Sequence, residues 1–243
     1  MTTDNVTTVL AEFARVAKAL ANPVRLHLLD LLSQAERNVE DLATAAGVPI
    51  GNTSAQLKVL RDAGLVCSRR DGTRIYYRLA GDDVAALYAS LRQVTRRRAP
   101  EAEAPRVVPL RVAASDATIT REELLRRRGD GRTLLIDVRP AVEYLAAHIP
   151  GAISMPVEEL RTRVEELPVG AEVVVYCRSS HCLLAREALW LLKSHGRCGR
   201  RLEEGMLEWR LQRFPLASGR PKPRRQLPVT PVREREHSAV RGA

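Results

Sequence analysis

The chain has 243 residues, of which 45% are hydrophobic and 28% are charged, with 4 Cys. This composition excludes a collagen, a fully disordered chain and a small disulfide-stapled domain, and it leaves room for one large or two ordinary domains. No run reaches the roughly 18 consecutive apolar residues of a membrane helix, and residues 1–20 show the charge spacing of an amphipathic helix instead of a signal peptide. We therefore expect a cytoplasmic protein with reduced thiols and no membrane partner.

The net charge of +10 lies mostly outside the segments that have the composition of folded domains. Residues 1–95 and 116–216 each carry a net charge of +1, whereas residues 96–115 carry +3 and residues 217–243 carry +5. Proline is also concentrated in residues 96–115 and 217–243. We therefore predict two domains, 1–95 and 116–216, joined by a basic linker, 96–115, and followed by a basic disordered tail, 217–243. The tail either solubilises the chain or contacts phosphate without specificity.

The first predicted domain begins with helices. Apolar residues recur at intervals of three and four over residues 10–33, and a break before Pro23 divides this stretch into two helices. A third helix is expected after Asn38, which is a good N-cap residue, and Gly47 is expected to end it.

A fourth helix is predicted from Asn52, as its N-cap, to Gly64. Leu57 and Leu60 are expected to face inward. Two short helices joined by a tight turn allow the second helix to lie in the major groove of DNA. The candidate DNA-contacting residues of this helix are Asn52, Thr53, Ser54, Gln56, Lys58 and Arg61.

Two β-prone runs, 65–70 and 73–79, follow this helix. Asp71-Gly72 between them is a strong hairpin signal, because both residues tolerate a positive φ in a two-residue turn. Basic side chains crowd the predicted tip, where they could reach flanking phosphates: Arg69, Arg70 and Arg74. The pattern predicts a winged helix, and the alternative is a small helical domain with a solvated, Arg-rich turn.

Residues 19–32, 39–66 and 69–79 closely resemble the ArsR-type winged-helix repressors. The resemblance implies a homodimer formed by the first and last helices, with residues 52–61 as the helix that reads operator DNA. The best-known metal sensors of that family place two Cys in the third helix. Asn38 and Glu40 stand at those positions here, so the thiolate ligands that soft metals and arsenite prefer are absent from it.

The second predicted domain alternates strands and helices. The runs 133–138 and 172–177 are rich in β-branched residues, as is typical of buried parallel strands. Amphipathic helices are predicted at 120–128, 157–166, 183–195 and about 205–213. This order predicts an α/β domain with a central, mostly parallel sheet and right-handed crossovers.

Cys177 ends the second of these strands, and a short loop separates it from the next helix. The loop residues are Arg178, Ser179, Ser180, His181 and Cys182. Reactive groups in open α/β sheets gather at the carboxyl ends of the strands. Backbone N–H groups of the loop and the first turn of the helix stabilise an anion, so we expect a lowered pKa and a nucleophilic thiolate at Cys177. The alternative is a buried structural cysteine.

Residues 136–156, 173–196 and 200–215 resemble rhodanese domains. The resemblance implies that Cys177 attacks a sulfane sulfur and carries it as a persulfide. The six-residue loop from Cys177 to Cys182 matches the length found in sulfur-transferring members, whereas related phosphatases carry one residue more. Ser180 and Cys182 replace a Gly and a basic residue that are frequent in efficient thiosulfate users, so the donor stays open.

Several other residues have alternative roles. Asp137 and Arg139 form a structural ion pair or support catalysis. His181 contributes its backbone N–H or acts as a general base, and Cys182 packs at the helix start or resolves the Cys177 persulfide. Structural roles, mostly in the core, are expected for Cys67, His148, Trp190, Cys198 and Trp209.

These patterns together predict a two-domain chain, an α+β winged helix-turn-helix followed by an α/β rhodanese-like domain. The first functional hypothesis is a homodimeric repressor of double-stranded operator DNA whose second domain senses a small sulfane-sulfur donor, such as thiosulfate or a persulfide. The second is a sulfurtransferase whose winged helix only controls its own operon. A metal- or arsenic-responsive repressor is the weaker third. No cofactor or metal ligand set is expected.

Overall fold

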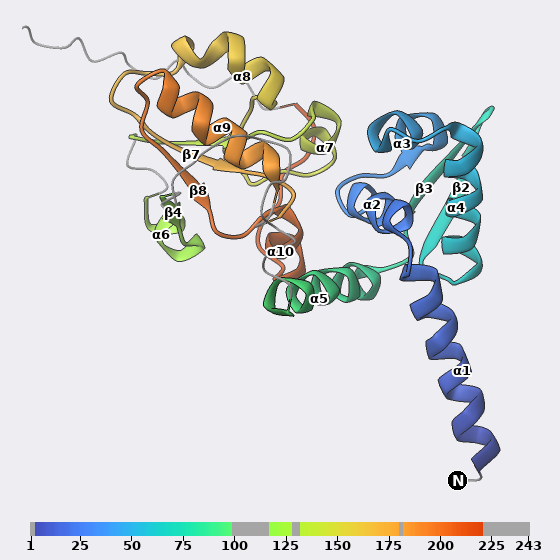
Figure 1. Cartoon of the computed structure of the whole chain (residues 1–243). Helices are drawn as coiled ribbons and strands as arrows, with labels where there is room; N and C mark the ends of the chain where they lie inside the picture. The colour runs from blue at the N-terminus through green and yellow to red at the C-terminus, as the bar shows by residue number, and fades with distance from the viewer. Residues whose placement is uncertain (1–2, 99–116, 128–131, 180–181, 221–243) are drawn as a thin grey trace, which may run out of the picture.

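The computed structural model describes residues 3–98, 117–127, 132–179 and 182–220, and it places two domains side by side (Figure 1). The long helix α1 of the first domain projects away from the rest of the molecule. Within the described ranges, no helix is long and apolar enough to cross a membrane.

The first domain is built of five helices and a small antiparallel sheet in its described part. Its elements are α1 (Thr3–Leu20), α2 (Pro23–Leu32), β1 (Arg37–Asn38), α3 (Val39–Ala46), α4 (Ile50–Asp62), β2 (Val66–Asp71), β3 (Arg74–Leu79) and α5 (Asp82–Arg98). The strands pair in the order β1-β3-β2. This arrangement confirms the predicted winged helix-turn-helix.

Side-chain caps explain where two of these helices begin. The Asn22 side chain accepts a hydrogen bond from the Arg25 N–H at the start of α2, and Pro23 occupies the first helical position. Asn38 caps α3 in the same way, and Gly47 ends that helix with a φ of +66°. The predicted boundaries at Pro23, Asn38 and Gly47 are therefore confirmed.

Two local predictions in this domain are wrong. The helix α4 begins at Ile50, after an extended Pro49, so Asn52 lies inside its first turn and does not cap it. In the hairpin, Asp71 pairs with Arg74, which leaves Gly72 and Thr73 as the central turn residues. Gly72 alone of these two has a positive φ, +59°, as a type II′ turn requires.

The second domain is a five-stranded parallel sheet with helices on both faces. Its elements are β4 (Thr118–Ile119), α6 (Arg121–Arg127), β5 (Thr133–Asp137), α7 (Ala141–Ala146), β6 (Ile153–Ser154), α8 (Val157–Arg163), the 3₁₀ turn η2 (Val164–Glu166), β7 (Glu172–Tyr176), α9 (Leu183–Ser194), β8 (Gly199–Leu202) and α10 (Met206–Leu211). The strand order is β4-β8-β7-β5-β6, and all pairs are parallel.

Strand residues alternate between the two apolar layers of this domain. On β7, Val173 and Val175 pack with α8 and α9, whereas Val174 and Tyr176 pack in the layer that contains α10. Both faces are therefore buried, as is typical of parallel sheets. The helix α7, which is only six residues long, is absent from the elements predicted above.

Both predicted domain boundaries, at residues 95/96 and 216/217, fall short of where the observed domains end. The helix α5, whose first turns are anchored by buried Val84 and Tyr88, continues to Arg98. Residues 99–115 of the predicted linker lie outside the described residues. Ala217 forms a bridge with His148, so the chain stays packed on the second domain past residue 216. Residues 221–243 lie outside the described part.

Some of the residues expected in the core are exposed in the structure. Trp209 and His148 are buried, as predicted, but Trp190 is 44% exposed on α9. Cys198 is exposed and Cys67 is partly exposed. Cys198 directly precedes β8 and is not part of the strand.

Candidate functional site

Cys177 directly follows β7, at the carboxyl edge of the parallel sheet. Its side chain is 1% exposed and packs in the layer between the sheet and α9. A disulfide joins it to Cys182, the residue before α9, with the two Cα atoms 6.0 Å apart. The disulfide departs from the expectation of reduced thiols, and its Cα separation lies in the ordinary range for such a bond. Ser180 and His181 lie outside the described residues.

The start of α10 holds the other side of this loop. The backbone N–H of Met206 donates to the Cys177 carbonyl over 2.9 Å, and that of Leu207 donates to the Arg178 carbonyl over 3.0 Å. Gly205 lies directly against the loop backbone, since a Cβ built on it would be 2.1 Å from the Ser179 nitrogen. The position and shape of the loop are therefore tied to α10.

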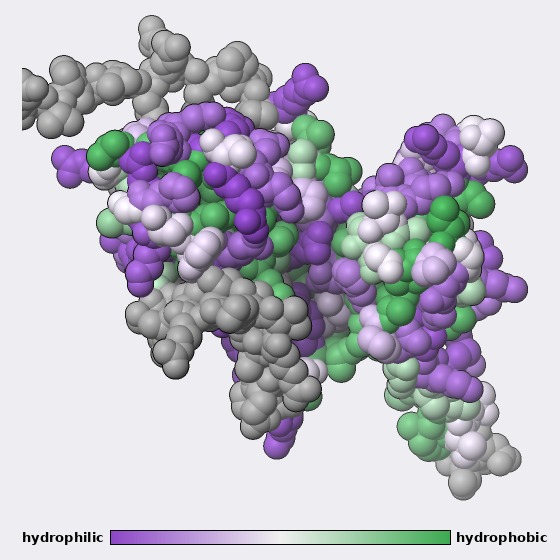
Figure 2. Space-filling model, turned by 45° about the horizontal axis from the view of Figure 1, so that its top comes forward, coloured by the Kyte–Doolittle hydropathy of each residue, from purple (hydrophilic) through white to green (hydrophobic). Residues whose placement is uncertain are grey.

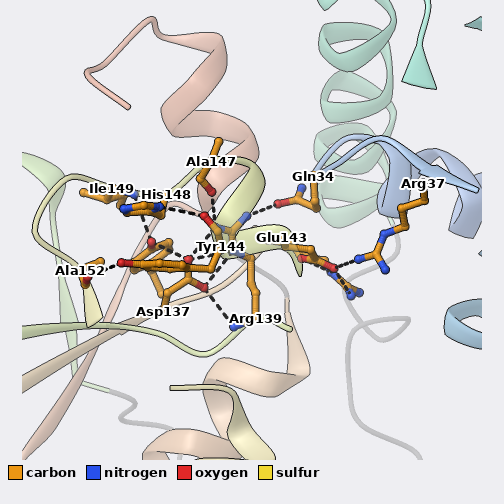
Figure 3. Close-up of polar contacts among 12 residues, drawn as sticks. Gln34, Arg37, Asp137, Arg139, Glu143, Tyr144, Ala147, His148, Ile149 and Ala152 are labelled. Carbon is orange, nitrogen blue, oxygen red and sulfur yellow. Dashed lines mark hydrogen bonds and ion pairs between the residues drawn. The ribbon is translucent and has the colours of Figure 1, made fainter. Parts of the chain in front are cut away.

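Asp137 ends β5 and forms a fully buried ion pair with Arg139 (Figure 3). Arg139 Nη2 lies 2.6 Å from Asp137 Oδ2, and the Tyr176 hydroxyl donates to the same oxygen over 2.6 Å. Burial, and then the Asp137 charge, raises the pKa of Tyr176 well above its ordinary value, so the hydroxyl stays protonated. These contacts fix the neighbouring ends of β5 and β7.

Glu143 on α7 connects the loop to the first domain (Figure 3). Its fully buried carboxylate lies 2.7 Å from Arg178 Nη2 and 2.6 Å from Arg37 Nη2 of β1. Burial opposes the charged form of Arg178, but the contact with Glu143 outweighs it and raises its pKa. Burial dominates at Arg37 and lowers its pKa. One carboxylate thus pairs with an arginine from each domain.

The loop also contacts α5 directly. Arg92 of α5 donates a hydrogen bond to the Ser179 hydroxyl. Asp30 of α2 lies 3.7 Å from Arg92 and 3.7 Å from Arg178, so it stands between the two guanidinium groups. Charged groups from both domains therefore surround the loop.

The helix α10 reaches from the loop into the first domain. Leu207 is buried in the apolar core of the first domain, and Leu211 packs against that core. Arg210 Nη1 donates to the Ser33 carbonyl at the end of α2 over 2.8 Å. The helix that holds the loop backbone is thus also part of the packing of the winged helix (Figure 1).

Most predicted DNA-contacting residues of α4 are accessible. Asn52, Ser54, Lys58 and Arg61 are exposed, and Gln56 is half-buried. Thr53 is the exception, because it is fully buried and its hydroxyl donates to the Pro49 carbonyl over 3.1 Å. Thr53 therefore holds the start of α4 and is not available to contact DNA.

The three arginines of the predicted wing are exposed but differ in their partners. Arg69 donates to both carboxylate oxygens of Glu36, over 2.9 Å to Oε1 and 2.8 Å to Oε2, and lies over the Tyr76 ring. Arg70 donates to the Gly72 carbonyl at the turn. Arg74 sits beside the turn as the partner of Asp71 in the strand register. The wing thus presents three cations, one of which is already paired.

Sequence reasoning misses the residues that join the domains. Asp30, Arg92, Glu143 and Gly205 all contact the loop or its neighbours, and none is a predicted site residue. Glu143 belongs to the missed helix α7, and the other three carry no local motif. Their roles depend on how the two domains meet. In the described ranges, no three His, Cys, Asp or Glu side chains are placed to share a metal ion.

Comparison with known proteins assigns both domains. Residues 22–68 match the family model described as bacterial regulatory protein, arsR family, and residues 120–212 match the rhodanese-like domain. A structure of the homodimeric winged helix-turn-helix DNA-binding domain from Mycobacterium bovis is 48% identical, covering 41% of this chain and 92% of that chain with a TM-score of 0.39.

Some curated relatives match nearly the whole chain, and others match only about a third of it. The HTH-type transcriptional regulator Rv0324 of Mycobacterium tuberculosis is 46% identical over 224 residues, 90% of this chain and 96% of that protein. A biofilm growth-associated repressor of Agrobacterium fabrum is 42% identical over 80 residues, 33% of this chain and 68% of that protein. The chain therefore belongs to the ArsR family of winged helix-turn-helix transcriptional regulators, in a form that carries a C-terminal rhodanese-like domain.

Proposed function

We propose that this regulator is a repressor that senses sulfane sulfur through Cys177 and transmits the chemical state of the loop to its winged helix. The observation that carries the proposal is the direct contact between the loop and the first domain. Arg92 reaches the loop at Ser179, and Glu143 joins Arg178 to Arg37. A sulfurtransferase without coupling would not need its active loop at the domain boundary.

The chemistry follows from two cysteines at one sheet edge. The Cys177 thiolate attacks the sulfane sulfur of a donor, the donor's sulfur–sulfur bond breaks, and the electron pair leaves with the remainder of the donor. The Cys182 thiolate then attacks Cys177 Sγ, a disulfide forms, and the outer sulfur leaves as hydrosulfide. The Cα separation of 6.0 Å is compatible with this last bond.

The helix α10 is our proposed route from the loop to the winged helix. A change in the loop moves the Cys177 and Arg178 carbonyls, which accept hydrogen bonds from the first two residues of α10. The same helix packs against the first domain through Leu207 and Leu211. Packed elements shift between discrete arrangements instead of deforming gradually, so the loop state can bias the position of α4.

We also propose a homodimer. Along α1, four apolar side chains are 42 to 65% exposed: Val6, Val9, Leu10 and Phe13. Figure 2 shows hydrophobic residues on this projecting helix. A contiguous exposed apolar face of this kind marks a protein contact, and pairing through α1 would bring two copies of α4 to successive major grooves.

Operator release tests the proposal. The DNA would be the region upstream of the gene, and binding by the full chain would be followed by anisotropy before and after tetrasulfide treatment. We expect wild type, Cys67→Ser and Cys198→Ser to release DNA, and Cys177→Ser to stay bound. Cys182→Ser should form the persulfide without the disulfide and release less DNA. Equal release by all variants, or by none, would favour an uncoupled sulfurtransferase.

A further inference from the structure

A cavity of about 410 Å³ lies between the two domains, next to the loop. Asp30, Tyr88 and Arg92 of the first domain line one side, and Arg178, Ser179 and Cys182 line the other. Its size is that of a small-molecule site. Neither domain encloses it alone, so the site exists only while the domains are in contact.

The charges around the cavity favour an anion. Arg92 and Arg178 each lie 3.7 Å from Asp30, which is too long for a hydrogen bond. Glu143 already pairs with Arg178, so Arg92 is the cation that an anionic ligand would meet. Among the described residues, Arg92 Nη1 is buried and has no hydrogen-bond acceptor, only the longer ion-pair contact with Asp30. A buried guanidinium nitrogen without a hydrogen bond is costly, and an anionic ligand oxygen in the cavity would supply the acceptor.

The two sulfur atoms of the disulfide differ in their access to this cavity. Cys182 lines it and is partly exposed, whereas Cys177 is 1% exposed and lies in the core beside α9. A thiol that enters the cavity therefore meets Cys182 first. Thiol–disulfide exchange depends on which sulfur is accessible and on how well the other sulfur leaves as a thiolate.

We infer that the cavity between the domains binds a small anionic thiol, which reduces the loop disulfide by attacking Cys182 and so resets the sensor. The thiolate sulfur bonds to Cys182 Sγ, the Cys177–Cys182 bond breaks, and the electron pair leaves on Cys177. A second thiolate attacks the mixed disulfide, releases the Cys182 thiolate, and yields the disulfide of the small thiol. Two small thiols are thus oxidised and the loop is reduced. The inference rests on the proposed function only in treating the disulfide as the signalling state.

The test compares thiols of different charge on the oxidised full chain. Glutathione is the anionic probe, 2-mercaptoethanol the uncharged one and cysteamine the cationic one, each corrected for its thiolate fraction. Wild type should prefer glutathione over cysteamine by about fivefold or more, as expected for one solvent-screened charge pair. Arg92→Gln should lose most of this preference and Arg92→Lys should keep it. Arg96→Gln, an exposed change on the same helix, is the matched control and should behave as wild type.

Mass spectrometry locates the attacked sulfur. Trypsin cleaves after Arg178 and therefore separates Cys177 from Cys182. After an acid quench at early times, we expect the glutathione adduct on the peptide from Ser179 to Arg186. An adduct on the Cys177 peptide, or equal charge preference in wild type and Arg92→Gln, would overturn the inference. If the adduct forms on the Cys182 peptide and Arg92→Gln loses the charge preference, but the operator is not released, only the proposed sensing function is contradicted.

Discussion

Gly205 touches the backbone of Ser179 so closely that no other residue fits there. A Cβ on Gly205 would lie 2.1 Å from the Ser179 Cα and 2.5 Å from the Arg178 carbonyl carbon. The φ of Gly205 is −113°, which any residue can adopt, so the constraint is the close approach and not backbone freedom. The contact joins the start of α10 to the reactive loop.

Gly205→Ala should therefore disable the loop. The clash is with backbone on both sides, so either the loop or α10 must move, and the hydrogen bonds from Met206 and Leu207 will weaken. We expect loss of persulfide formation at Cys177 and a lower free energy of unfolding, measured by mass spectrometry and urea denaturation. Gly51→Ala, which meets nothing within 4 Å, is the control and should retain both properties. Wild-type persulfide formation in Gly205→Ala would contradict the predicted dependence of the loop on α10.

Glu143→Gln should be strongly destabilising. The change leaves Arg37 and Arg178 buried without their shared counter-charge, and breaking a buried ion pair by removing one partner costs about 3 kcal/mol or more. The comparison is Glu159→Gln, which breaks an exposed pair with Arg163 and should change stability by at most about 0.5 kcal/mol. Urea denaturation measures both. A loss for Glu143→Gln no larger than that of the control would show that the network contributes little to holding the domains together.

Local sequence signals explain most of the fold. Apolar spacing, Asn22 and Asn38 as caps, and Gly47 as a helix end are all properties of short segments, and they predict α2 and α3 correctly. The errors arise where two local signals compete. Pro49 precedes the first turn of α4 and starts the helix before Asn52 can cap it. Gly72 is the first central residue of the turn and not the second, because this type of turn needs a positive φ only at its first central position.

The site is predictable only in part. The loop with Cys177 and Cys182 follows from strand order and from the resemblance to a known family. Arg92 lies 87 residues from its partner Ser179, and Glu143 lies 106 residues from its partner Arg37, so no local periodicity encodes these contacts across the domain boundary. Their roles emerge only from packing.

Charge removal at the wing should change the salt dependence of DNA binding. Each lost phosphate contact lowers the slope of log K against log salt by about 0.9. We expect Arg70→Gln with Arg74→Gln to lower the slope by about 2 for each bound protomer, and Arg69→Gln to lower it less, because Glu36 already pairs with Arg69. Arg163→Gln in α8 should leave the slope unchanged. Binding isotherms at several salt concentrations test this, and an unaltered slope in a triple wing variant would exclude phosphate contacts by the hairpin.

Base preference should depend on Gln56. Its amide donates to Asn52 Oδ1 over 3.0 Å and accepts from Arg25 over 2.9 Å, so its orientation on α4 is fixed before DNA arrives. A preorganised amide discriminates between bases in the major groove, by about 1 to 3 kcal/mol for a well-formed pair. Gln56→Ala should therefore weaken operator binding more than binding to unrelated DNA. An equal loss on both DNAs would place the specificity elsewhere.

Glu208 on α10 should make stability depend on pH. Burial raises the pKa of this carboxyl above its ordinary value, although its hydrogen bond from the Gly205 N–H acts in the opposite direction. The folded chain therefore binds the proton more tightly than the unfolded chain. The stabilisation is complete below the ordinary pKa and is lost as pH rises through the higher folded value.

Glu208→Gln removes this titration, because the amide stays neutral at every pH. Urea denaturation between pH 4 and about 7 would give the difference in unfolding free energy between wild type and variant. We expect wild type to lose stability relative to Glu208→Gln as pH rises. The exposed Glu165→Gln serves as the comparison and should run parallel to wild type. A constant difference between wild type and Glu208→Gln across this range would show that Glu208 titrates alike in the folded and unfolded chains.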